Sequence, residues 1–216
     1  TWLKQFKFQD TRYNMNFYLD NGTITKLTMM YQKQKYPYYN DTELKVRIIH
    51  IPYKSIDENR FVFTILLPYN GIKLSDIEEN LLINQQKLLM NNAFSIQELL
   101  LYLPKFKMEC QFQLSEILSE MGMTDAFDIH KADFSNIDNE KNNLYITKVI
   151  HKACIEVNEQ GSEAAAATAV IFTRGRSSTI RHPPPVEFTC DHPFLFMIRE
   201  EKRNITLFTG RFTTKP

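Results

Sequence analysis

The chain has 216 residues, of which 43% are hydrophobic and 24% charged, and its formal net charge is +1. This composition is that of a globular protein, and a net charge so close to zero gives no general attraction to nucleic acid or to membranes. The length suits one large domain or two small ones, and no apolar run approaches the roughly 20 residues of a membrane-spanning helix, so we expect a soluble protein.

The first part of the chain is predicted to form strands. Residues 6–39 are rich in Phe, Tyr, Thr and Met and contain an Asn-Gly pair at residues 21–22, which is typical of a hairpin turn. Residues 44–51 are predicted to form a strand in which Leu44, Val46 and Ile48 alternate with Lys45 and Arg47, and residues 61–67 are apolar except for Thr64. Each of these two runs is followed by a proline, which cannot donate to a ladder, so they predict a hairpin that is buried on at least one face.

The rest of the chain is predicted to combine short helices with further strands. Ser75 is expected to cap a helix, with Glu78 at the capping-box position, and a second helix is expected over residues 83–90. Residues 113–121 predict a short amphipathic helix that Gly122 ends in a left-handed conformation. Further strands are predicted over residues 97–106, 144–157, 186–190, 194–199 and 205–212.

The residue types that carry catalysis or bind metals form no recognisable motif. The five histidines lack metal-ligand spacing, the three cysteines include no CxxC pair, and the chain has neither a GxSxG nor a glycine-rich phosphate-binding motif. We therefore expect no enzymatic activity, no metal, no cofactor and no disulfide. Lys105, Lys107 and Lys131 form no continuous basic stripe and are expected to be solvent exposed.

Three sequences fit the acceptor pattern for N-glycosylation, at Asn21, Asn40 and Asn204. One such sequence arises easily by chance, whereas three in a chain of this size favour an extracellular protein. We therefore expect a secreted glycoprotein.

The sequence EQGSEAAAATAV at residues 159–170 contains four consecutive alanines and precedes a segment with three arginines and three consecutive prolines. Alanine has the highest helix propensity, so a short helix over residues 163–169 is one interpretation. A strand is the other, because the β-branched and aromatic residues at 168 and 170–172 prefer extended structure. Small side chains would let such a strand enter between two existing strands without steric conflict.

Residues 159–170 resemble the hinge of the serpins, a family of serine protease inhibitors, whose common form is Glu-Glu-Gly-Thr-Glu-Ala-Ala-Ala-Ala-Thr. Gln160 and Ser162 are the two departures from that form. Trp2 resembles a residue of the family's breach region, and His151 resembles its shutter histidine. The resemblance continues in the family's order through Ile51-Pro52-Tyr53, Leu66-Leu67-Pro68, Leu103-Pro104-Lys105-Phe106, LSEMGMTDAF at residues 118–127, HPFLF at residues 192–196 and LFTGR at residues 207–211.

The resemblance implies an α+β fold dominated by strands, with mixed and antiparallel sheets, short helices and an exposed reactive-centre loop. What the family places before Trp2 is missing from the chain, so we expect residues 1–216 to form the C-terminal part of a single serpin domain whose N-terminal half is absent. Trp2 and Leu3 are expected to lie in the core of that domain.

The resemblance also implies a suicide-substrate inhibitor of serine proteases. The protease cleaves the exposed loop and forms an acyl-enzyme, and the freed loop then inserts as a strand into the main sheet. A small-residue hinge keeps insertion fast relative to hydrolysis of the acyl-enzyme. The hinge residues are Glu159, Gly161, Ser162, Glu163, Ala164, Ala165, Ala166, Ala167 and Thr168.

The loop beyond the hinge is expected to set the target. We expect the reactive bond to be Arg176–Ser177, because an arginine suits the acidic specificity pocket of a trypsin-like protease, and Arg174–Gly175 is the alternative. Counting along the family's loop from Gly161 reaches Gly175, between the two arginines.

The expected partner is a trypsin-like serine protease in a covalent complex, with a polyanion such as heparin as a further candidate and no nucleic acid or membrane. The complete protein is expected to be a monomer. The alternative function is a non-inhibitory serpin-fold carrier or chaperone-like protein. Non-inhibitory relatives tend to have bulky, charged or proline residues where this chain has alanines, which favours the inhibitor.

Overall fold

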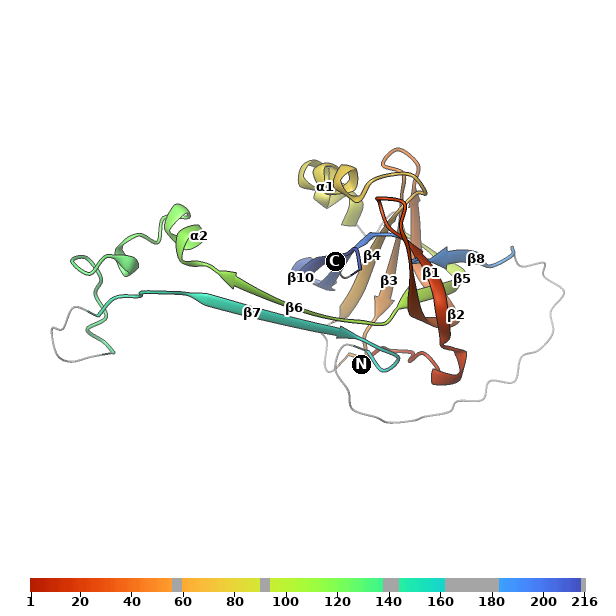
Figure 1. Cartoon of the computed structure of the whole chain (residues 1–216), viewed down its shortest axis with the longest axis horizontal. Helices are drawn as coiled ribbons and strands as arrows, with labels where there is room; N and C mark the ends of the chain where they lie inside the picture. The colour runs from red at the N-terminus through yellow and green to blue at the C-terminus, as the bar shows by residue number, and fades with distance from the viewer. Residues whose placement is uncertain (56–59, 90–93, 138–143, 162–182, 215–216) are drawn as a thin grey trace. The chain divides into compact units, whose positions relative to one another are not determined.

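The computed structural model describes residues 1–55, 60–89, 94–137, 144–161 and 183–214. It divides into two compact units, one formed by Thr1–Phe106 with Glu156–Pro216 and the other by Lys107–Ile155 (Figure 1). The alanine-rich part of the hinge and both candidate reactive bonds lie outside the described residues.

The larger unit is built on an eight-stranded sheet in which the strands follow the order β10-β9-β4-β3-β2-β5-β8, with β1 paired to β2 (Figure 1). The pairing of β5 with β8 is parallel, and the other described pairs of this sheet are antiparallel. The strands are β1 Arg12–Tyr18, β2 Ile24–Asp41, β3 Val46–Pro52, β4 Phe61–Pro68, β5 Ser95–Pro104, β8 Val186–Thr189, β9 Phe194–Glu200 and β10 Ile205–Phe212. The prediction of a strand-dominated chain with mixed sheets is confirmed.

The hairpin of β3 and β4 confirms the clearest strand prediction. Ile49 lies opposite Ile65 in the antiparallel register, and both strands end at the prolines that marked them in the sequence. Residues 62–68 of β4 are all buried. A strand that is apolar along nearly its whole length is expected to be covered on both faces, and β4 is covered in this way.

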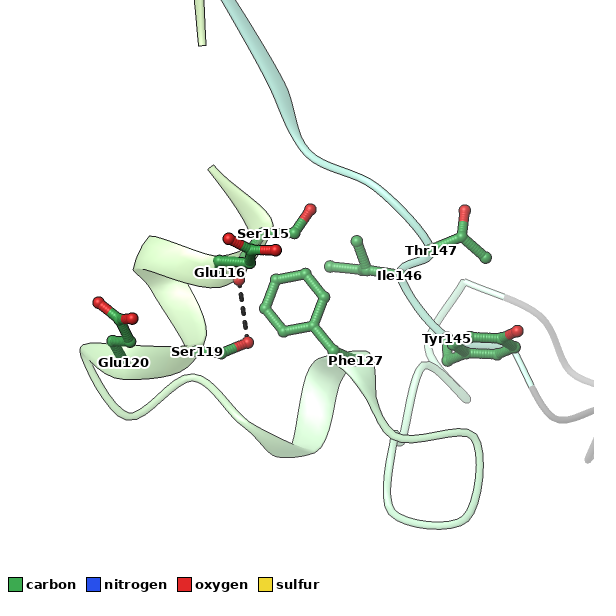
Figure 2. A pocket seen from close by; sticks show the side chains of 8 residues that line it. All are labelled: Ser115, Glu116, Ser119, Glu120, Phe127, Tyr145, Ile146 and Thr147. Atoms are coloured by element: carbon green, nitrogen blue, oxygen red, sulfur yellow. Dashed lines mark hydrogen bonds between the residues drawn. The ribbon is translucent and has the colours of Figure 1, made fainter. Parts of the chain in front are cut away.

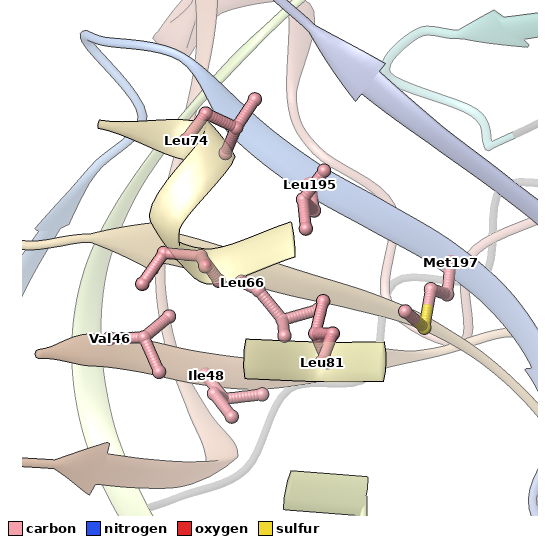
Figure 3. Packing of buried hydrophobic residues seen from close by; sticks show 8 residues of the cluster. Val46, Ile48, Leu66, Leu74, Leu81, Leu195 and Met197 are labelled. Carbon is pink, nitrogen blue, oxygen red and sulfur yellow. The ribbon is translucent and has the colours of Figure 1, made fainter. Parts of the chain in front are cut away.

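One face of this sheet packs against helix α1, Leu74–Leu89. Figure 3 shows Leu74 and Leu81 of the helix pointing toward apolar side chains of β3, β4 and β9. Burying each such side chain stabilises the fold by about 1.5–3 kcal/mol. The buried residues of this cluster are Val46, Ile48, Leu66, Leu74, Ile77, Leu81, Leu195 and Met197.

The start of α1 differs from the prediction. The helix begins at Leu74, and the amide of Asp76 donates to the carbonyl of Lys73 at 3.2 Å. Ser75 therefore lies inside the first turn, where its hydroxyl donates to Asp76 Oδ1 at 3.3 Å instead of capping the helix. The two predicted helices are a single helix, because the residues between them continue the same helical turns.

The smaller unit contains the short helix α2, Ser115–Glu120, a 3-10 turn at Asp125–Phe127, and most of the two-stranded sheet of β6 and β7. Strand β6 is Phe106–Gln113 and β7 is Ile150–Val157. Gly122 follows α2 with φ +101°, as predicted. The predicted strand from residue 144 is too long, because Ile146 donates instead to the carbonyl of Ala126 at 2.9 Å.

None of the helices in the described residues is long and apolar enough to cross a membrane. In the larger unit Trp2 is buried, as expected, but Leu3 is 55% exposed, so its predicted place in the core is wrong. The amide of Leu3 donates to the carbonyl of Pro52 at 2.8 Å, which directs the backbone along β3 while the leucine side chain faces solvent.

Candidate functional site

The last described residues before the hinge segment are held by the first residues of the chain. The amides of Phe6 and Trp2 donate to the carbonyls of Glu159 and Gln160, both at 3.0 Å. The indole Nε1 of Trp2 donates to the carbonyl of Asn158 at 2.8 Å. Three consecutive carbonyls that follow β7 therefore have fixed partners.

Trp2 can hold this position because its ring is buried, with only 1% of the residue exposed. The indole stacks on Tyr53 with ring centroids 4.8 Å apart and meets Phe6 and Phe63 edge to face. Aromatic pairs of this kind contribute about 0.5–1.5 kcal/mol each beyond their buried area. Trp2 thus joins the backbone after β7 to the aromatic core.

Glu159 is a buried carboxylate, with 1% of the residue exposed. Its Oε1 accepts a hydrogen bond from Thr11 Oγ1 at 2.8 Å, and its Oε2 lies 2.8 Å from Lys105 Nζ. Burial by itself raises the pKa of Glu159, but the hydrogen bonds from Lys105 and Thr11 outweigh it and leave the pKa below its usual value. The side chain is therefore a charged anchor that is hydrogen-bonded to Thr11 and ion-paired with Lys105.

Gly161 occupies a place that no other residue fits. Its φ is +125°, and a Cβ at this position would lie 2.6 Å from the Cα of Thr1 and 2.7 Å from the amide nitrogen of Trp2. These neighbours are backbone atoms and cannot rotate away. We call Trp2, Thr11, Lys105, Glu159 and Gly161 the hinge anchor, since together they fix the chain immediately before the alanine-rich segment.

The structure places three of the sequence-predicted site residues together, namely Trp2, Glu159 and Gly161. His151 is an exposed residue of β7, and its ring centroid is 6.4 Å from that of Phe112 in the neighbouring strand β6. Its role as a shutter residue stays a prediction. The other predicted hinge and reactive-bond residues lie outside the described residues: Ser162, Glu163, Ala164, Ala165, Ala166, Ala167, Thr168, Arg174, Gly175, Arg176 and Ser177.

The sequence analysis missed Thr11 and Lys105. Lys105 was expected to be a solvent-exposed lysine, and that is wrong: its ammonium group pairs with buried Glu159, and its side chain is 35% exposed. Lys107 and Lys131 are exposed as expected, at 58% and 63%. Lys105 is the single residue between the end of β5 at Pro104 and the start of β6 at Phe106. This position next to a proline was the only local sign that Lys105 differs from Lys107 and Lys131.

The smaller unit has a cavity of about 520 Å³ beside α2 (Figure 2). Phe127 lies between α2 and the segment containing Tyr145 and Ile146. The hydroxyl of Ser119 donates to the carbonyl of Ser115 at 2.9 Å. Because no histidine lines this cavity, neither serine has an imidazole base there.

His50 in the larger unit is a structural residue. It is 2% exposed, its Nδ1 lies 2.8 Å from Thr64 Oγ1, and its ring stacks on Phe94. Burial, with a smaller contribution from Arg199, lowers the pKa of His50 to about 3. A ring that stays neutral under all physiological conditions is typical of a core histidine.

All three cysteines are free in the structure. Cys110 and Cys154 are exposed, whereas Cys190 is buried. Burial raises the pKa of the Cys190 thiol, which keeps it protonated and unreactive.

The three asparagines of the glycosylation sequences are exposed, and each side-chain oxygen accepts a hydrogen bond. Asn21 accepts from the amide of Thr23, Asn40 from the hydroxyl of Tyr69, and Asn204 from the guanidinium of Arg199. The three side chains therefore have local structural partners.

A family model described as "Serpin (serine protease inhibitor)" matches residues 1–215. Among curated proteins, the chain is 37% identical to intracellular coagulation inhibitor 2 of Tachypleus tridentatus, over 97% of this chain and 49% of the relative. It is 37% identical to human Serpin B8, over 99% of this chain and 54% of the relative, and 38% identical to human Serpin B10, over 97% and 51%. The chain thus spans about half the length of the curated relatives it matches.

Solved structures agree with this comparison. Serpin48 of the insect Tenebrio molitor is 30% identical with a TM-score of 0.75, covering 100% of this chain and 53% of that one. Thyroxine-binding globulin in complex with thyroxine is 26% identical with a TM-score of 0.75, covering 99% and 53%. These likenesses confirm the predicted serpin fold and its strand-dominated class.

The relatives overturn our expectation of a secreted glycoprotein. The Tachypleus relative is named an intracellular coagulation inhibitor, which contradicts the expected extracellular location. The sequences at Asn21, Asn40 and Asn204 were a weak guide, because a three-residue pattern does not determine the compartment in which the chain folds.

Proposed function

Because the chain belongs to the serpin family of serine protease inhibitors, we propose that it is the C-terminal part of a single serpin domain that inhibits a trypsin-like protease as a suicide substrate. The family is one of inhibitors and not of enzymes. The observation that carries the proposal is the hinge anchor, which fixes the backbone up to Gly161 immediately before a segment of small residues.

The covalent step takes place on the loop. The serine Oγ of the protease attacks the carbonyl carbon of Arg176 and its proton passes to the protease's own base. The bond from Arg176 to Ser177 breaks, the new amine of Ser177 takes up the proton, and an ester joins the protease to Arg176. Hydrolysis of this ester would release an active protease, so inhibition requires that the loop insert before water attacks.

The anchor gives the moving segment a fixed origin. Glu159 and Gly161 cannot shift without exposing a paired carboxylate or breaking backbone contacts with Thr1 and Trp2. Insertion therefore proceeds from Gly161 outward, beginning with Ser162 and the alanines. A serine hydroxyl is cheap to bury when it finds a partner, whereas an unpaired charge at the same place costs several kcal/mol.

Strand β7 supplies the template for insertion. In the described residues β7 pairs with β6 along one edge, and its other edge has no partner strand. The unpaired amides and carbonyls of such an edge are ready to accept an added strand. In sequence, the segment that begins after Gly161 follows shortly after the end of β7 at Val157, so we propose that this segment adds to the free edge.

The arginines of the loop support a trypsin-like target. A guanidinium entering an acidic pocket forms a charge-assisted, often bidentate hydrogen bond. Arg176–Ser177 is the proposed reactive bond and Arg174–Gly175 the alternative. A polyanion such as heparin is proposed as an accessory partner that would bind outside these residues.

A non-inhibitory carrier is the second candidate. The observation that favours it is the likeness to thyroxine-binding globulin, a protein of the same fold that binds the small molecule thyroxine. The hinge argues for the inhibitor, because four consecutive alanines offer no steric obstacle to insertion. A carrier has no need of an insertable hinge.

The test is to mix the intact protein with trypsin and separate the products by SDS electrophoresis. The proposal predicts an SDS-resistant complex and a released C-terminal peptide that begins at Ser177. A carrier would be cleaved without forming the complex. A peptide beginning at Gly175 would move the reactive bond to Arg174.

A further inference from the structure

The chain contains two Asn-Gly pairs, at residues 21–22 and 70–71, and both lie in exposed turns of the larger unit. The first turn joins β1 to β2, and the second follows β4 and precedes α1. Gly22, Asn70 and Gly71 line the same cavity of about 580 Å³. The same chemistry is therefore open to both pairs, and they differ in how the folded chain holds their reacting atoms.

An asparagine that precedes a glycine can lose its side-chain amide without a catalyst. The backbone nitrogen of the glycine attacks Cγ of the asparagine, and a C–N bond forms. The side-chain nitrogen takes up the proton of the glycine amide and leaves as ammonia. Water then opens the five-membered succinimide at one of its two carbonyls, which yields either aspartate or isoaspartate. Glycine favours the attack because it has no Cβ to obstruct the close approach.

The turn at Asn21 holds both reacting groups. The amide of Gly22, whose nitrogen would attack, donates to the carbonyl of Leu19 at 2.9 Å. The carboxamide oxygen of Asn21 accepts the amide of Thr23 at 2.9 Å. The amide of Leu19 also donates to the carbonyl of Thr23 at 2.9 Å, which closes the turn. Attack at Asn21 therefore requires that at least the first two of these hydrogen bonds break.

The turn at Asn70 does not hold the corresponding groups. The hydrogen bond across this turn runs from the amide of Ile72 to the carbonyl of Tyr69, at 3.0 Å, and involves neither reacting group. Within the described part of the chain, the amide of Gly71 and the carboxamide of Asn70 have no hydrogen-bond partner. A Cβ at Gly71 would meet no atom within 4 Å, so there is space around the attacking nitrogen.

We propose that Asn70 is a site of spontaneous deamidation in the folded protein, and that Asn21 is protected by its turn although it has the same Asn-Gly sequence. The only reactant besides the chain is water, and the only product besides the chain is ammonia. The inference concerns the chemistry of this chain alone and holds whether or not the chain is an inhibitor.

The modification changes both the charge and the backbone at this turn. It adds a carboxylate to a cavity that Asp20, Lys73 and Asp191 also line. The isoaspartate product also adds a carbon to the backbone shortly before Ile72, which packs against the apolar cluster of α1. The modified protein is therefore a more acidic species, and its isoaspartate form is expected to disturb the start of α1.

The test is to incubate the intact protein at neutral pH and to follow both sites by mass spectrometry after digestion with pepsin at acid pH. We expect Asn70 to convert about tenfold faster than Asn21, since two hydrogen bonds must break at Asn21 before the attack. The same measurement in denaturant is the control, because both sites are then Asn-Gly pairs in an unfolded chain and should react at similar rates. Methyl transfer by a protein isoaspartate methyltransferase identifies the isoaspartate product.

Equal rates at the two sites in the folded protein would overturn the proposal, and so would conversion of Asn70 in denaturant only. Two variants give an independent reading by ion-exchange chromatography, and both change exposed residues. Asn70→Gln should remove the acidic species that the parent accumulates, because a glutamine closes its larger ring much more slowly. Asn21→Gln is the matched control and should leave the rate of its appearance unchanged. The opposite result would assign the reaction to Asn21 and contradict the protection by its turn.

Discussion

Replacing Lys105 by methionine tests the hinge anchor, because it removes the cation while keeping most of the side chain's length. The ammonium group lies 2.8 Å from Oε2 of Glu159, whose side chain is 2% exposed, so the variant leaves a buried carboxylate with Thr11 as its remaining described partner. Removing one member of a buried ion pair costs about 3–5 kcal/mol. The Lys105 side chain is 35% exposed, so water can partly take the place of the ammonium group in the variant. We therefore expect the free energy of unfolding to fall by about 2–3 kcal/mol.

The assay is thermal unfolding at two pH values. A loss of this size lowers the unfolding temperature by about 4–12 °C at pH 7 for a chain of this length. In the parent the pKa of Glu159 is depressed, so the stability of the pair is present above the ordinary carboxylate pKa and is lost as pH falls through the folded value. In the variant, burial without the ammonium raises the pKa of Glu159, and protonation relieves the cost. The difference in unfolding temperature between the parent and the variant should therefore become smaller below about pH 4.5.

Lys107→Met is the matched control. Lys107 pairs with Glu109 at 3.3 Å, but their side chains are 58% and 48% exposed, and exposed pairs contribute less than about 1 kcal/mol. If Lys105→Met lowers the unfolding temperature no more than Lys107→Met, or if the gap does not narrow at low pH, Glu159 is not held as a buried ion pair.

Three further changes probe the hinge and the loop. Gly161→Ala should lower the free energy of unfolding by at least about 2 kcal/mol, because Gly161 has a φ of +125° and a Cβ there would contact Thr1 Cα. Gly22→Ala is the control, since Gly22 has open space around it, and it should cost about 1 kcal/mol. Equal effects of the two changes in thermal unfolding would contradict the tight fit at Gly161. Ser162→Arg should raise the number of inhibitor molecules consumed per protease inactivated while cleavage continues, and unchanged stoichiometry would exclude insertion. Arg176→Ala should slow trypsin inhibition at least tenfold, in line with the about 2–5 kcal/mol cost of unpairing a buried acid, while Arg174→Ala changes it modestly; the reverse order would assign the reactive bond to Arg174.

The sequence predicted the parts of the fold that depend on neighbouring residues. Pro52 and Pro68 end their strands because proline lacks a donor, and Gly122 follows α2 because it tolerates a positive φ. The parallel pairing of β5 with β8 was not predictable, since nothing local to either strand encodes a partner so distant in the chain. Ser75 fitted a capping pattern, but the helix starts at Leu74, whose side chain is buried against the sheet.

In the hinge anchor, too, some residues could be identified from the sequence and others only from the folded structure. Glu159 and Gly161 could be selected from the sequence because the family hinge resembles this segment. Thr11 and Lys105 could not, because their value depends on a buried carboxylate that only the folded chain brings to them. A lysine considered alone is expected to lie on the surface, and only its ion pair with a buried carboxylate shows that Lys105 has a structural role.

The central claim is that the segment after Gly161 inserts as a strand once the loop is cut. The most direct measurement is the thermal stability of the intact protein before and after cleavage of the loop between residues 168 and 177 by a protease that the protein does not trap. Insertion adds a full set of strand hydrogen bonds and apolar contacts, so the cleaved protein is expected to unfold at a clearly higher temperature than the uncleaved one. An unchanged or lower unfolding temperature after cleavage would contradict insertion and with it the proposed inhibitory mechanism.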